Sequence, residues 1–143
     1  MTWEKASQIA TAVGVPVIVV GLALTWFAYV AQTRATAANT FQEYLKVSLD
    51  PANARFIAPT DTLLLCDQRY QIYASFALLV GESITNLPGE GAAWKRTIED
   101  LVRDQRVFVT SVYFPMDEYS AEYQRLVKRI VRTAGSRPVH CPT

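Results

Sequence analysis

The residues best suited to chemistry are one histidine and two cysteines, and their positions limit what they can do. His140 and Cys141 are neighbours close to the end of the 143-residue chain, and Cys66 lies far before them. A zinc site built from these three residues would lack a fourth ligand and the short pairwise spacing of known sites. His140 is also not on a predicted rigid element that could hold it beside a nucleophile. The sequence therefore predicts no metal site, no cofactor and no enzymatic activity.

The two cysteines have a second interpretation, which depends on the compartment. An even pair of cysteines outside the cytoplasm is expected to close, whereas the same pair in the cytoplasm remains as thiols. A disulfide requires Cα atoms about 4.4 to 6.8 Å apart, which the sequence does not establish. A bridge between Cys66 and Cys141 therefore remains one of two alternatives.

Four carboxylates are the next candidates for chemistry. A carboxylate pair for acid–base catalysis could come from Asp67, Glu82, Glu99 and Asp100. They are scattered along amphipathic segments, however, which favours solvated or ion-paired carboxylates. From Arg34 onward the chain has 13 basic and 12 acidic residues, so it lacks the positive field typical of nucleic-acid binding.

A basic stripe follows the last predicted helix. Its members are Arg125, Lys128, Arg129 and Arg132. Such a stripe could contact anionic lipid headgroups or an acidic partner. The alternative is that these cations simply lie favourably towards a helix C-terminus.

The N-terminal part of the chain has the pattern of a membrane span. No charged side chain occurs from Ala6 to Thr33, and the 23 residues from Ile9 to Ala31 are almost entirely apolar. A helix of this length covers about 35 Å, enough to cross a hydrocarbon core of about 30 Å. Trp3, Trp26 and Tyr29 are spaced to occupy the two membrane interfaces. We therefore expect the lipid bilayer to be one partner of the chain.

Small residues recur along one face of this predicted span. Ser7, Gly14, Gly21 and Ala28 are seven residues apart, and Ala10 precedes Gly14 at a small-xxx-small spacing. Small side chains let membrane helices approach one another closely. The face predicts other membrane helices as partners, although Gly and Ala are also common in spans that have no such role.

A cleaved signal peptide is the competing interpretation of this segment. Lys5 could provide its basic region, and Ala35-Thr36-Ala37 could be read as a cleavage site. The apolar stretch exceeds the usual 7 to 15 residues of a signal peptide, so we favour an anchor. Basic residues flank both ends almost equally, and we expect a cytoplasmic domain in preference to a periplasmic one.

The rest of the chain predicts an all-α fold, in which the N-terminal transmembrane helix continues into a small soluble bundle of three to four helices. We expect the membrane helix to continue to Asp50-Pro51, a second helix from Thr60 or Asp61 to about Asn86, and a third over 91–113. A fourth should start near Asp117 or Ser120 and end at Gly135. The domain boundaries are an anchor over 1–34, a helical domain over 35–135 and a tail over 136–143.

The sequence makes two further predictions, on the apolar stripe of the second helix and on residues 107–113. The mostly apolar stripe on the second helix consists of Leu65, Arg69, Ile72, Tyr73, Phe76, Leu79, Val80 and Ile84. Residues 107–113 are rich in β-branched and aromatic side chains typical of a strand. We prefer a helix there, because an isolated strand would find no partner elsewhere in the chain.

The order of these features also carries a resemblance. The apolar span is followed by TRATAANTFQEYLKVSLDP, by a Tyr-rich segment ending in GESITNLP, and by AAWKRTIEDLVRD. This order resembles uncharacterised bacterial membrane proteins that have one span and a short helical soluble domain. The resemblance implies the fold only, and it transfers no activity. We expect the protein in the bacterial inner (plasma) membrane.

These observations predict a non-enzymatic, single-pass membrane protein. We expect an accessory, assembly or interaction subunit of a larger membrane complex, because the small-residue face and the long helix both present surfaces for partners. The alternative is a membrane-tethered sensor or regulatory domain that reads lipid charge or transmits a signal.

Overall fold

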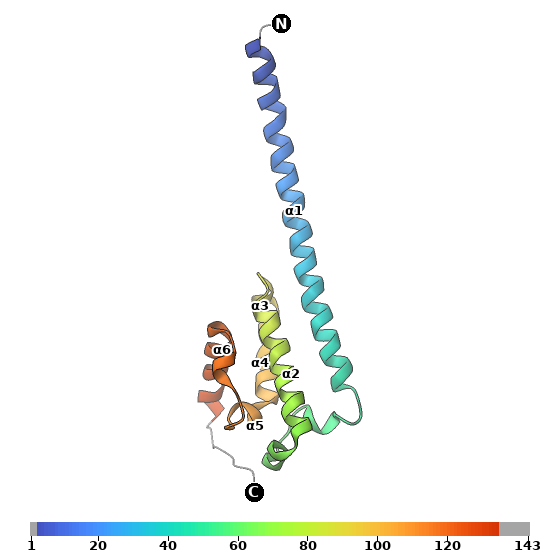
Figure 1. The fold of residues 1–143 in the computed structure, drawn as a ribbon, viewed down its shortest axis with the longest axis vertical. Helices are drawn as coiled ribbons and strands as arrows, with labels where there is room; N and C mark the ends of the chain where they lie inside the picture. Colours follow the sequence, from blue (N-terminus) through green and yellow to red (C-terminus); the bar gives the residue numbers. More distant parts are fainter. Residues whose placement is uncertain (1–2, 135–143) are drawn as a thin grey trace. The chain divides into compact units, whose positions relative to one another are not determined.

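The computed structural model describes the backbone of residues 3–134 and the side chains of residues 18–132. Over this range the chain forms six α-helices and three short 3-10 helices, without a strand (Figure 1). The predicted all-α class is therefore confirmed. The fold divides into two compact units, Met1–Ala35 and Thr36–Thr143, which are described separately below.

The first unit belongs to the long helix α1, Trp3–Ser48. This helix is long and apolar enough to cross a membrane over Ile18–Ser48, and only 6% of its most apolar window is buried. The side chains from Ile18 to Tyr29 that are large and apolar are all exposed. The apolar surface of this segment is therefore not used to build a protein core.

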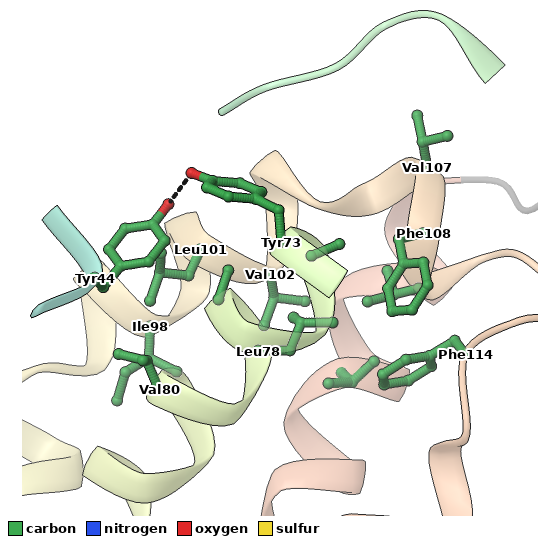
Figure 2. Close-up of a cluster of buried hydrophobic side chains, with 14 of the residues drawn as sticks. Tyr44, Tyr73, Leu78, Val80, Ile98, Leu101, Val102, Val107, Phe108 and Phe114 are labelled. Carbon is green, nitrogen blue, oxygen red and sulfur yellow. Dashed lines mark hydrogen bonds between the residues drawn. The ribbon is translucent and has the colours of Figure 1, made fainter. Parts of the chain in front are cut away.

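The last turns of α1 belong to the second unit, where they pack against other helices. The ring of Phe41 lies 5.2 Å from that of Trp94. The hydroxyl of Tyr73 lies 3.2 Å from that of Tyr44 (Figure 2). It also lies 2.8 Å from the hydroxyl of Ser48. Tyr44 and Ser48 are both buried, so this end of α1 forms one wall of the soluble bundle, as the predicted continuation of the helix requires.

Three helices complete that bundle: α2, Gln68–Thr85; α4, Lys95–Asp104; and α6, Ala121–Ala134. They contact one another in all three pairs. Each places apolar residues inward at helical spacing, which is how an amphipathic helix buries one face. Figure 2 shows part of the resulting core. Its members on these helices include Tyr70, Leu78, Val80, Ile84, Ile98, Leu101, Val102, Tyr123, Val127 and Ile130.

The second predicted helix is wrong in its start. A 3-10 helix, η2, Thr62–Cys66, comes first, and α2 begins only after Asp67. The carboxylate of Asp61 accepts a hydrogen bond from the amide of Leu63, and that of Asp67 accepts one from Arg69. Two successive side-chain caps therefore start two helices where the apolar periodicity suggested one.

The third predicted helix is likewise interrupted. It consists of α3, Glu90–Ala93, then α4, then α5, Arg106–Val109, with breaks at Trp94 and Gln105. The preference for helix over strand is confirmed at α5, although the chain turns after Thr110. Gly89 precedes α3 with φ of 78°, a left-handed conformation that favours glycine.

Gln105 explains the second break. Its side chain is fully buried, and its amide nitrogen donates to the backbone carbonyls of Phe56 and Ile57, both at 3.0 Å. Phe56 ends the connector helix η1, Ala54–Phe56. The helix is interrupted at Gln105, whose amide bonds to the connector. No other described side chain donates to these two carbonyls.

The last helix begins close to its predicted start. The short η3, Met116–Glu118, precedes α6, and a carboxylate oxygen of Glu82 accepts a hydrogen bond from the amide of Ser120. The predicted C′ residue Gly135 and the tail 136–143 lie outside the described residues.

Candidate interaction surfaces

The small-residue face predicted on the span can be examined only at its C-terminal end. The side chains of Trp3, Ser7, Ala10 and Gly14 lie outside the described residues. A Cβ added at Gly21 would meet nothing within 4 Å, and Ala28 is exposed. The surface around these two positions is open, and its occupation by another helix stays a prediction.

Thr25, Trp26 and Tyr29 lie on the part of the predicted span that the structure describes. The hydroxyl of Thr25 donates to the carbonyl of Gly21 at 2.8 Å, so it is satisfied within its own helix. The rings of Trp26 and Tyr29 lie 6.2 Å apart, and both are exposed. These features are compatible with the predicted interfacial aromatics.

The predicted basic stripe separates into two parts in the structure. Arg125 and Arg129 on α6 line a pocket of about 400 Å³ together with Lys95 of α4. Lys128 and Arg132 are exposed and do not line it. The remaining walls come from Thr85, Gly91, Ala92, Ile98, Glu122 and Leu126.

The three cations of this pocket, which we call the basic pocket, differ in their partners. Arg129 forms an ion pair with Glu99 at 3.2 Å, and Glu99 also reaches Arg103 at 3.8 Å. The Nε of Arg125 donates to the backbone carbonyl of Ala121. No described carboxylate pairs with Lys95 or with Arg125. The basic pocket therefore contains one cation fixed by a carboxylate and two that are not neutralised.

An apolar surface runs along α2. Ile72 is 63% exposed and Leu79 is 54% exposed, with the partly buried Phe76 between them. We call these three residues the α2 apolar face. Ile72 and Leu79 belong to the predicted apolar stripe but are exposed, because the core lies under Tyr73, Ala77 and Val80 on the neighbouring side of the helix.

Two hollows meet at this face, because Phe76 lines both. One, of about 460 Å³, is otherwise bordered by Val47, Asn53, Arg69, Ile72 and Tyr73. The other, of about 320 Å³, is bordered by Ser75, Leu79, Glu82, Pro115, Glu118 and Tyr119.

The candidate carboxylates are all used in the structure of the domain. Asp67 caps α2 and pairs with Arg55 at 2.7 Å, while Asp100 pairs with Arg103. Glu82 caps α6, and Glu99 holds two arginines as described above. Within the described residues no three His, Cys, Asp or Glu side chains gather as they would to hold a metal ion.

Cys66 ends η2, and its sulfur takes part in a disulfide. The chain contains one other cysteine, Cys141, which lies outside the described residues. The pairing of these two therefore stays a prediction.

Comparison with known proteins adds no identification to this geometry. The chain matches no protein-family model, no curated protein and no solved structure.

The structure also brings in residues that the sequence did not single out. Lys95 is the first residue of α4, directly after the break at Trp94. The sequence analysis predicted one continuous helix here and no break. Its signal was present, because Lys95 is three residues before Ile98 and so borders the buried face of α4. No sequence signal placed α4 beside Arg125 and Arg129, since that depends on how the helices pack.

Proposed function

We propose that this chain is a non-enzymatic, single-pass membrane protein that acts as an accessory or interaction subunit of a larger membrane complex. The observation that carries the proposal is the exposure of apolar side chains on α1 from Ile18 to Tyr29. Exposed apolar surface of this extent marks contact with a membrane or another protein. We propose the bacterial inner (plasma) membrane as its location.

The alternatives for this helix have less support. A core helix would be mostly buried, whereas only 6% of the apolar window of α1 is buried. Cleavage at Ala35-Thr36-Ala37 would cut α1 next to Ala37, which is fully buried in the soluble unit. A retained anchor keeps that helix intact, so we prefer it to a signal peptide.

The disulfide of Cys66 bears on the topology of this anchor. Disulfides persist in oxidising compartments and are rare in the cytoplasm. We therefore place the soluble domain on the outer side of the membrane in this proposal, in contrast to the cytoplasmic side that the flanking charges suggested.

The α2 apolar face is the surface through which we propose that the domain binds its partner. Ile72 and Leu79 leave large apolar side chains in water, and the two hollows beside Phe76 could receive side chains of another protein. Buried apolar anchors in such hollows supply most of the binding energy of an interface.

The test measures the size of the complex extracted from native membranes in mild detergent. We expect the unaltered chain to migrate well above the mass of its 16.0 kDa monomer, and I72K/L79K to lose that association. The matched control is L63K/V112K, which places two lysines at exposed apolar positions outside the face. A lone monomer before any substitution would contradict the proposal, and equal loss in the control would remove the α2 apolar face from it.

A second candidate function is a membrane-tethered regulatory domain. One observation favours it: the basic pocket presents two cations without an acidic partner, as a site that senses an anion requires.

A further inference from the structure

We propose that the basic pocket binds a phosphate-type anion through Lys95, Arg125 and Arg129. This site is independent of the α2 apolar face, because the two share no residue. The three cations come from two helices and line the same hollow, so one ligand can contact all of them.

The charge balance of the pocket favours an anion. Three cationic side chains and one carboxylate, Glu122, line it. Glu99 does not line the pocket, and it pairs with Arg129 at 3.2 Å from the α4 side. This pair holds the guanidinium of Arg129 in place while Lys95 and Arg125 keep their charge for a ligand.

The kind of cation indicates the kind of anion. An arginine guanidinium offers parallel N–H groups that match the oxygens of a phosphate, and a lysine adds a compact positive charge. The Nε of Arg125 is already bonded to the carbonyl of Ala121, so the terminal nitrogens of its guanidinium are the donors left for a ligand. With Glu122 in the lining and Glu99 paired to Arg129, the three cations keep one positive charge in excess, which favours an anion.

The size of the pocket limits the ligand to a small group. A volume of about 400 Å³ lies within the range of small-molecule sites, which is about 300 to 1,000 Å³. Gly91 and Ala92 leave one wall without long side chains. The phosphate could belong to a lipid headgroup or to a free small molecule, since both present the same oxygens.

The experiment uses the full chain in a neutral detergent and measures its melting temperature by light scattering and intrinsic fluorescence. One arm adds inorganic phosphate against chloride at equal ionic strength. The other adds short-chain phosphatidic acid against short-chain phosphatidylcholine. We expect a rise in melting temperature that saturates with ligand, because an anion that binds only the folded state stabilises it.

The variants separate a site from diffuse attraction. We expect K95Q/R125Q to weaken binding by about tenfold or more, because it removes two charge-assisted contacts. The matched control K128Q/R132Q removes the same charge from exposed positions outside the pocket, and we expect its affinity to stay within about twofold. Ala92→Glu adds a carboxylate to the pocket wall and should block binding without removing a cation, which keeps the test decisive if K95Q/R125Q does not fold.

The outcomes are distinct. Binding of both ligands, of phosphatidic acid alone or of phosphate alone would support the site and identify the source of the phosphoryl group. No saturable rise with either ligand would overturn the proposal. Equal weakening in K128Q/R132Q, or none in either K95Q/R125Q or Ala92→Glu, would also overturn it.

Discussion

The helices α1 and α2 are both rich in apolar residues, yet they use that surface in opposite ways. On α1 the large apolar side chains between Ile18 and Tyr29 are exposed on all sides of the helix. On α2 most of them are buried, and the exposed ones lie together on the α2 apolar face. The distribution of apolar residues around a helix, rather than their number, therefore decides whether it suits a bilayer or a protein core.

Polar groups follow the same division. The hydroxyl of Thr25 donates to the carbonyl of Gly21 within α1. In the soluble unit, the hydroxyls of Ser83 and Thr85 bond within their own helix in the same way, whereas Gln105 bonds to the connector around Phe56. The soluble unit therefore adds hydrogen bonds between distant parts of the chain to those that each helix makes within itself.

The largest expected effect tests the membrane side of this comparison. In V20K/L24K two lysines lie on one face of the predicted span, and each costs about 2.5 kcal/mol or more near the centre of a membrane helix. We expect this variant to leave the membrane pellet after alkaline carbonate extraction, whereas L63K/V112K remains there. Retention of V20K/L24K in the pellet would show that α1 does not cross the bilayer at these residues.

The next effect separates two neighbouring leucines on α2. Leu78 is fully buried and Leu79 is 54% exposed. We expect Leu78→Lys to lose about 4 kcal/mol or more of unfolding free energy, because it buries an unpaired charge and removes core contacts. Leu79→Lys should stay within about 0.5 kcal/mol. Chemical denaturation of both variants measures the difference, and similar losses would mean that the buried face of α2 is assigned incorrectly.

Much of this fold follows from apolar periodicity, and the exceptions share a cause. The existence and approximate positions of α1, α2, α4 and α6 were predicted, because their repeats are long. The breaks at Asp67 and Gln105 were not, because they depend on a carboxylate that caps a helix and on an amide that bonds to a connector far away in sequence. Local patterns do not contain those contacts.

The same limit applies to the candidate sites. Arg125 and Arg129 were identified as part of a stripe, but a stripe on one helix does not reveal a pocket. Only the packing of α4 beside α6 adds Lys95 and separates these arginines from Lys128 and Arg132. The α2 apolar face was missed for a related reason: the predicted stripe was too wide, and the core needed only part of it.

The third prediction tests the dependence of the soluble unit on a contact between elements. Gln105→Leu keeps the volume of the side chain but leaves the carbonyls of Phe56 and Ile57 without their donor. We expect a loss of about 1 kcal/mol in unfolding free energy. Buried unpaired groups cost about 1 to 3 kcal/mol each, but the substitution also removes the Oε1 of Gln105, which is buried without a hydrogen-bond partner. Gln71→Leu, which removes a half-buried bond to the carbonyl of Leu65, is the control and should cost less. Equal costs would contradict a special role of Gln105.

The smallest effect concerns Asp104, at the end of α4. Burial raises the pKa of its carboxyl above the ordinary value, and the charge of Asp100 adds to this. The folded state therefore holds the proton of Asp104 more tightly than the unfolded chain does. Protonated Asp104 stabilises the fold in acid, and this stabilisation is lost as the pH rises through the raised pKa. Asp104→Asn cannot ionise and should avoid that loss.

The measurement for Asp104 is the melting temperature between pH 4 and pH 7. We expect Asp104→Asn to gain stability relative to the unaltered chain as the pH rises, by a few tenths of a kcal/mol because the site is only partly buried. Asp117→Asn, on the exposed η3, is the matched control and should follow the unaltered chain. If Asp104→Asn lost stability towards neutral pH instead, the carboxylate of Asp104 would have a favourable partner in the folded state. Desolvation would then not be the dominant effect on Asp104, and this end of α4 would not differ in that respect from the solvent-facing η3.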